Sequence, residues 1–138
     1  MATVLQPAEQ GIVSYLRSVT RTSASTRVPH PLPAGGFIVV RRSGGAPRNL
    51  VQTDPTMLVE VWGAGSYENV RVDPWNLTKQ VWEALARADE EGTLDAHGVD
   101  VMRVSLTEPA AYPDESTGTP RYTFIFTPTL NTNRGDLA

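Results

Sequence analysis

The chain contains no cysteine among its 138 residues. This absence excludes a disulfide framework, a thiolate metal site and a cysteine nucleophile, and it suits a reducing compartment. The sequence also begins without the basic, apolar and small-residue pattern of a secretion signal, and it has no apolar run near the ~18 residues that span a bilayer. We therefore expect a protein that is made in a cytoplasm and has no membrane contact.

Basic charge is also scarce. The chain has 12 Lys and Arg residues against 15 Asp and Glu residues, which gives a formal net charge of −3 and a pI near 5.3. A protein that wraps DNA or RNA needs a basic surface to replace the counterions of the phosphates. The charge balance therefore argues against tight nucleic-acid binding by the surface as a whole.

Motifs for catalysis, cofactors and metals are missing as well. Gly63-Ala64-Gly65 resembles the opening of a dinucleotide-binding loop, but Glu68 stands where the third glycine is needed, and its carboxylate would face the pyrophosphate. His30 and His97 have no ligand partner at helical spacing. No candidate catalytic pair stands at a motif spacing either. We predict no enzymatic activity, no cofactor and no metal.

The residues that are present indicate one folded domain. The length lies near the commonest domain size, and a hydrophobic fraction of 40% is enough for one core. Eleven glycines and eleven prolines indicate long, well-punctuated loops. We expect a single α+β domain over residues 1–130 and a flexible C-terminal tail over residues 131–138, because the tail has little to bury.

Two segments have the apolar spacing of amphipathic helices. They cover residues 8–19 and residues 74–88. Residues 63–72, before the second helix, permit two interpretations: a helix that starts near Ser66 and is kinked by Pro74, or a loop that ends where the helix begins. We favour a kinked or two-part helix.

Strands are indicated by runs of β-branched, aromatic and other apolar residues between turn residues. The first two runs form a hairpin with a turn over residues 43–47, and Asp54-Pro55 predicts a second turn before the third run. Residues 20–36 and 109–120 are expected to form an extended connector and a polar loop. The predicted strands cover residues 37–42, 49–52, 57–62, 99–106 and 121–127. This order predicts an α+β fold: a mostly antiparallel sheet of about five strands with two helices packed on one face.

The order of these segments resembles a known protein family. A short amphipathic helix precedes the hairpin sequence Phe37-Ile38-Val39-Val40-Arg41-Arg42-Ser43-Gly44-Gly45, and Leu58-Val59-Glu60-Val61-Trp62-Gly63 leads into a helix that carries Trp and Ala. Over residues 8–130 this layout resembles the tail terminator proteins of long, non-contractile-tailed bacteriophages, especially those of actinobacteria. Two features depart from the family: Pro74, which would interrupt a helix that usually runs unbroken, and the Ser/Thr-rich connector after Val19.

The resemblance implies a structural virion protein at the junction of tail and neck, assembled in the host cytoplasm. A hexameric ring would cap the tail tube protein, stop its polymerisation and join the tail to head–tail connector proteins. Six copies at −3 each would give the ring a charge of −18, so genome DNA would pass through without tight binding. Two alternatives stay open: another neck protein, such as a head-closure or head–tail joining subunit, and a small ligand-binding α+β domain.

Long loops and more tryptophan than a small core needs suggest surfaces that close against identical neighbours. Two arginines at the end of the first hairpin strand are expected to dock on an acidic rim of the last tube ring. The candidate interface residues are Arg41, Arg42, Gly44, Gly45, Trp75, Pro109, Tyr112, Asp114 and Glu115. The candidate lumen residues are Glu108, Asp114 and Glu115.

Overall fold

The computed structural model of the chain describes residues 8–48, 52–90, 94 and 97–131. The predicted tail therefore lies outside the described residues except for Asn131. Most of the predicted second strand, residues 49–51, lies outside them as well.

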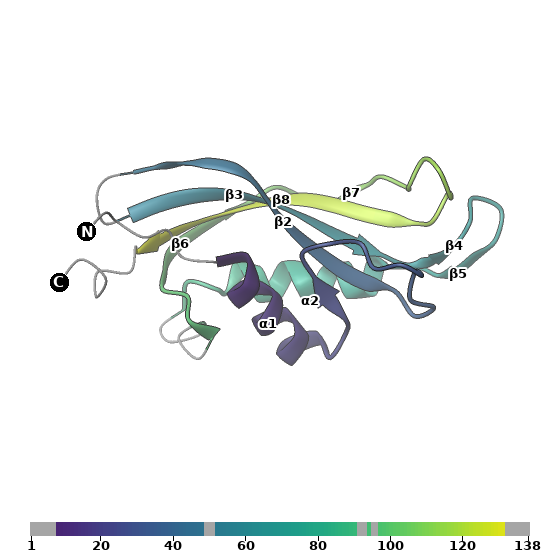
Figure 1. Ribbon diagram of the computed structural model, residues 1–138, viewed down its shortest axis with the longest axis horizontal. Coiled ribbons are helices and arrows are strands. Elements are labelled where there is room, and N and C mark those ends of the chain that lie inside the picture. Colours follow the sequence, from purple (N-terminus) through teal and green to yellow (C-terminus); the bar gives the residue numbers. More distant parts are fainter. Residues whose placement is uncertain (1–7, 49–51, 91–93, 95–96, 132–138) are drawn as a thin grey trace.

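A long twisted sheet lies over a layer of two helices (Figure 1). All strand pairs of the sheet are antiparallel except the first, in which β1 and β2 run parallel. The α+β prediction with two helices on one face is thus confirmed, with a six-stranded sheet in place of about five strands. The helices are α1 (Ala8–Thr20) and α2 (Trp75–Ala86), and the strands in spatial order are β1 (Ala24–Ser25), β2 (Phe37–Pro47), β3 (Gln52–Trp62), β8 (Arg121–Asn131) and β6 (Val101–Leu106), with β7 (Ala110–Ala111) also paired to β8.

Alternation along the strands separates a helix-covered face from an open face. Met57, Val59 and Val61 of β3 are fully buried in the main core, which both helices share. The residues between them point to the other side of the sheet, because successive strand side chains alternate. There Trp62 stacks on Phe37 with ring centroids 5.1 Å apart. The fold thus leaves one sheet face without helices.

The first hairpin is longer than predicted. β2 extends to Pro47, so the predicted turn over residues 43–47 was wrong. Gly45 pairs with Pro55, so Asp54-Pro55 also belongs to a strand and the predicted turn there was wrong. The pairing of β3 with β8 runs from Met57 to Trp62 and resumes at Thr53. The proline lies in this interruption, where its missing N–H disturbs the ladder least.

Residues 63–72 form a small hairpin, and the prediction of a kinked helix was wrong. β4 (Ala64–Gly65) pairs with β5 (Val70–Val72), and the N–H of Ser66 donates to the carbonyl of Asn69 across the turn. Gly65 has a φ of 115°, which a helix does not allow. Pro74 consequently lies at the N-cap of α2 and does not interrupt a helix.

Two short strands occur in segments that were predicted to be loops. β1 anchors the connector to β2, where Ala24 pairs with Ile38. β7 anchors the long 109–120 loop to β8, where Ala110 pairs with Thr123. Both attachments lie toward the end of the sheet where β3 stops and β8 starts, so they bring the connector and the loop near each other.

Candidate functional site

Arg121, the first residue of β8, is the centre of a polar cluster on the open face. It pairs with Trp62 in the strand register, and its guanidinium lies over the Trp62 ring, 4.8 Å from the centroid. The same guanidinium lies 5.4 Å from the centroid of the Tyr112 ring, and the Tyr112 carbonyl accepts a 2.8 Å hydrogen bond from Nε of Arg121. Two aromatic rings therefore hold this cation at the point where the long loop returns to the sheet.

Glu60 supplies the buried anion of the cluster. The residue is only 5% exposed, and its carboxylate pairs with Arg121 at 3.6 Å and with Arg41 at 3.2 Å. The indole N–H of Trp62 donates to the same carboxylate at 3.4 Å. Arg41, a predicted interface residue, is thus tied to the sheet on the open face, although nearly half of its side chain is exposed.

Asp114 orders the loop above this cluster. Its carboxylate accepts hydrogen bonds from the Thr117 hydroxyl at 2.7 Å, the Ser116 hydroxyl at 2.8 Å and the Thr117 N–H at 3.0 Å. These bonds, chiefly the one from the Thr117 hydroxyl, lower the pKa of the Asp114 carboxyl. Because Asp114 also lies 4.0 Å from Arg121, the loop and the sheet form one electrostatic unit.

A cavity of about 390 Å³ lies between this loop and the connector. Its floor is Trp62 and Arg121, and the connector contributes Val28, His30 and Leu32 to its wall. Val28 also packs on the small aromatic cluster of the open face. The connector therefore covers part of the sheet face that has no helix on it.

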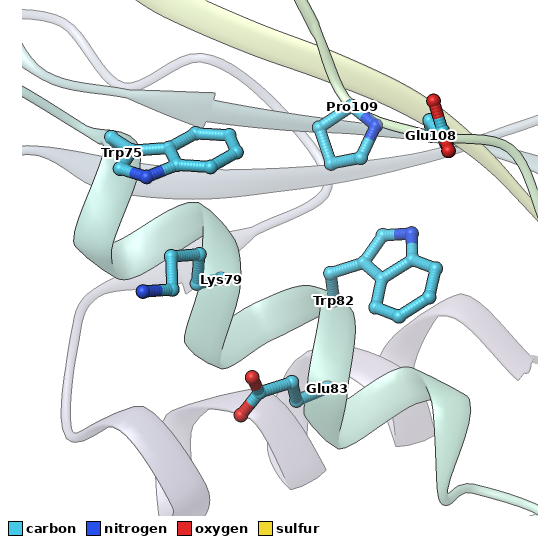
Figure 2. Close-up of a pocket in the computed structure, with 6 residues that line it drawn as sticks. All are labelled: Trp75, Lys79, Trp82, Glu83, Glu108 and Pro109. Atoms are coloured by element: carbon cyan, nitrogen blue, oxygen red, sulfur yellow. The ribbon is translucent and has the colours of Figure 1, made fainter.

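A second hollow, the α2 groove, is lined by Trp75, Lys79, Trp82, Glu83, Glu108 and Pro109 and has a volume of about 340 Å³. Figure 2 shows the two indole rings on α2 and Pro109 across from them on the segment between β6 and β7. The indole N–H of Trp82 donates to the carbonyl of Thr107 at 2.9 Å, which ties α2 to the segment after β6. The Trp75 ring lies against Tyr122 with centroids 5.1 Å apart, and the residue as a whole is 43% exposed.

Large exposed apolar side chains gather at the end of the sheet where β3 stops and β8 starts. Seven such side chains occur among the described residues, and five of them lie on the β4–β5 hairpin, the connector, the start of α2 or the long loop. Exposed apolar groups that cluster are typical of protein contact sites. The five residues, which we call the aromatic end, are Leu32, Tyr67, Val70, Trp75 and Tyr112.

The opposite end of the sheet is formed by the hairpin arm, which we define as the described residues 42–48 and 52–56 (Figure 1). A register shift between Arg42 and Gly44 marks a bulge, and Gly44 and Gly45 have φ values of 129° and 117°. Arg48 pairs with Asp54 at 3.1 Å. A hydrogen bond from Thr129, followed by the contacts with Arg48, lowers the pKa of the Asp54 carboxyl.

The structure divides the predicted interface and lumen residues into three groups. Trp75, Glu108 and Pro109 line the α2 groove. Tyr112 and Asp114 surround Arg121, Arg41 joins them through Glu60, and Glu115 is exposed in the same loop. Arg42, Gly44 and Gly45 lie apart from both groups, on the hairpin arm.

Sequence reasoning missed the residues at the centre of the site. Glu60 and Arg121 are far apart in the chain, and each looks like an ordinary strand charge. The signal that was present is periodicity: Glu60 shares a face with Trp62 on β3, which places a carboxylate beside an indole. Nothing in the sequence indicated that β8 would add a cation next to them.

Within the described ranges, no three His, Asp or Glu side chains lie close enough together to hold a metal ion. Neither α1 nor α2 is long and apolar enough to cross a membrane. Several charged groups on the open face instead form ion pairs with one another: Glu60 pairs with Arg41 and Arg121, and Arg121 also contacts Asp114.

No protein-family model and no curated protein matches this chain. Among solved structures, a chain described as "Virion of native gene transfer agent (GTA) particle" is similar over 84% of this chain and 84% of its own length, with a TM-score of 0.52 and 14% sequence identity. At this identity the likeness shows a shared fold. The chain therefore has a fold that also occurs in a protein of a virion particle.

Proposed function

We propose that the chain is a structural virion protein, and within the virion a tail terminator that caps the tail tube and joins the tail to the head connector. The observation that carries the proposal is the fold, which a chain of a gene transfer agent virion shares over 84% of both lengths. The resemblance in the order of sequence segments supports the finer assignment.

The surfaces of the molecule support an assembly role. The aromatic end exposes Trp75, Tyr67 and Tyr112, which are residue types that carry binding energy at protein interfaces. The hairpin arm extends the sheet at the other end. A subunit with different contact surfaces at its two ends suits the heterologous contacts that close a ring.

In this proposal six copies form the ring, one side of which meets the tail tube protein and the other the connector proteins. The ring lies at the tail–neck junction after assembly in the host cytoplasm. Its summed charge of −18 would repel the phosphates of the genome, so that DNA slides through the ring. Of the three acidic residues expected in the lumen, Asp114 and Glu115 lie together in the long loop and are the proposed lumen residues, whereas Glu108 lies in the α2 groove.

The test is the length and attachment of tails when the protein is missing. Particles assembled without a tail terminator should yield over-long, headless tails, because nothing stops tube polymerisation. Tails of normal length that fail to attach to heads would indicate a head-closure or head–tail joining protein instead. Normal, infectious or DNA-transferring particles would overturn the virion role altogether.

A further inference from the structure

We infer that, in the proposed ring, the hairpin arm of one copy docks in the α2 groove of the next copy, with Arg42 facing Glu83 and Glu108. This inference rests on the proposed function, because it needs copies arranged side by side. Each contact between neighbouring copies then consists of the hairpin arm of one copy and the α2 groove of the other.

The α2 groove has the composition of an incomplete interface. Its walls are the rings of Trp75, Trp82 and Pro109, and Trp75 is 43% exposed. The side chains of Glu83, Glu108 and Lys79 have no hydrogen-bond or ion-pair partner among the described residues. Two carboxylates against one cation leave the groove with an excess negative charge next to an apolar surface. A partner segment with a cation and small side chains would match both the negative charge and the apolar surface of the groove.

The hairpin arm has the complementary composition. Arg48 is neutralised by Asp54, whereas the Arg42 side chain has no ion-pair or hydrogen-bond partner in the part of the chain that the structure describes. The arm therefore presents one excess positive charge. Next to Arg42 stand Gly44, Gly45 and Ala46, and the space around Gly44 is open. Small residues let a backbone approach flat aromatic rings closely.

The positions of the two surfaces fit a head-to-tail contact. The strand register places Phe37, Trp62 and Arg121 at the aromatic end and the pair of Pro47 and Thr53 at the far end of the hairpin. The α2 groove includes Trp75 of the aromatic end and no residue of the hairpin arm, so groove and arm are separate surfaces of one subunit. Different, complementary surfaces on one subunit are what a closed heterologous ring requires.

Site-specific cross-linking on purified tails tests the contact directly. Because the chain has no native cysteine, Ala46→Cys provides a single thiol on the exposed arm for a photoactivated cross-linker. The expected product is a dimer of this chain in which residue 46 is linked to the α2 segment 75–83. The control is Gln10→Cys, which is exposed on α1 and should not give this product.

Other products separate the possible failures. A link from residue 46 to a tail tube subunit would overturn the inference and place the arm on the tube rim, while the proposed function would stand. A ring on the tails without any link to residues 75–83 would also overturn only the inference. Tails that carry no copy of this chain would overturn the proposed function itself.

Charge exchange gives a second, independent readout. Arg42→Glu should lower ring occupancy on tails by about tenfold or more, because it places like charges against each other across the interface. Combining it with Glu83→Arg and Glu108→Arg should restore the occupancy, because the attraction is rebuilt with opposite signs. If the triple variant assembles no better than Arg42→Glu alone although its fold is intact, the arm does not meet these carboxylates.

Discussion

Replacing Glu60 by Gln tests whether the open face is held together by its buried carboxylate. The substitution keeps the shape of the side chain and removes its charge. Glu60 is 5% exposed and faces Arg121, whose side chain is only 12% exposed, so the variant leaves a nearly buried guanidinium without its main anion. Removing one partner of a buried ion pair costs about 3–5 kcal/mol.

The lower end of this range applies here. Arg121 keeps its hydrogen bond to the Tyr112 carbonyl and its 4.0 Å contact with Asp114. We therefore expect Glu60→Gln to reduce the free energy of unfolding by about 3 kcal/mol, which lowers the Tm of a domain of this size by about 10 °C. Urea denaturation and a thermal melt of the purified protein measure both values.

Arg41→Gln is the matched control, because it removes the other cation of the same carboxylate. The Arg41 side chain is 46% exposed, so this pair is screened by solvent and its loss should cost less than about 1 kcal/mol. Two results would refute the reasoning: a Glu60→Gln variant within about 1 kcal/mol of the wild type, or an Arg41→Gln variant that is destabilised as much as Glu60→Gln.

Three further predictions concern the long loop and the surface charge. Gly118→Ala should destabilise the domain by about 1–3 kcal/mol, because Gly118 has a φ of 71° and a Cβ there would lie 2.4 Å from the Tyr67 ring; a denaturation curve equal to that of the wild type would contradict this. The lowered pKa of Asp114 adds stability that is present above its unfolded pKa of about 4 and is lost as the pH falls through the folded value, so the stability difference between the wild type and Asp114→Asn should shrink on acidification from pH 7 to pH 3; an unchanged difference would count against the loop's role. The purified protein should not bind duplex DNA tightly at physiological salt, as measured by fluorescence anisotropy, and strong binding would exclude a passive lumen.

The helices and most of the strand positions were predictable because burial imposes a period on the sequence. The spacing of apolar residues placed α1 within one residue of its observed end and α2 within two residues of both its ends. The β-rich run from Met57 to Trp62 placed this part of β3, and its residues Met57, Val59 and Val61 lie on the helix-covered face.

The errors have a common physical origin. Asp54-Pro55 and the segment around Gly65 were assigned from local preferences, but strand pairing decided both, and pairing depends on residues far away in the chain. β1 and β7 are two residues each and have no periodicity that a sequence can show. Their positions follow from the edges of the long strands that they join.

The candidate site was predictable only in part for the same reason. A surplus tryptophan and a long loop predict Trp75 and Pro109 as interface residues, and the structure brings them into one groove. Glu60 and Arg121 were not chosen, since their pairing requires β3 and β8 to be neighbours in the sheet. Long-range topology, which the sequence encodes only weakly, thus decides the electrostatics of the open face.

Imaging of purified tails at a resolution that separates subunits tests the central claim most directly. The account predicts a ring of six copies of this chain at the head-proximal end of every finished tail, with neighbouring copies in head-to-tail contact. A tail end without such a ring, or copies of this chain distributed along the tube, would contradict the assignment as a tail terminator.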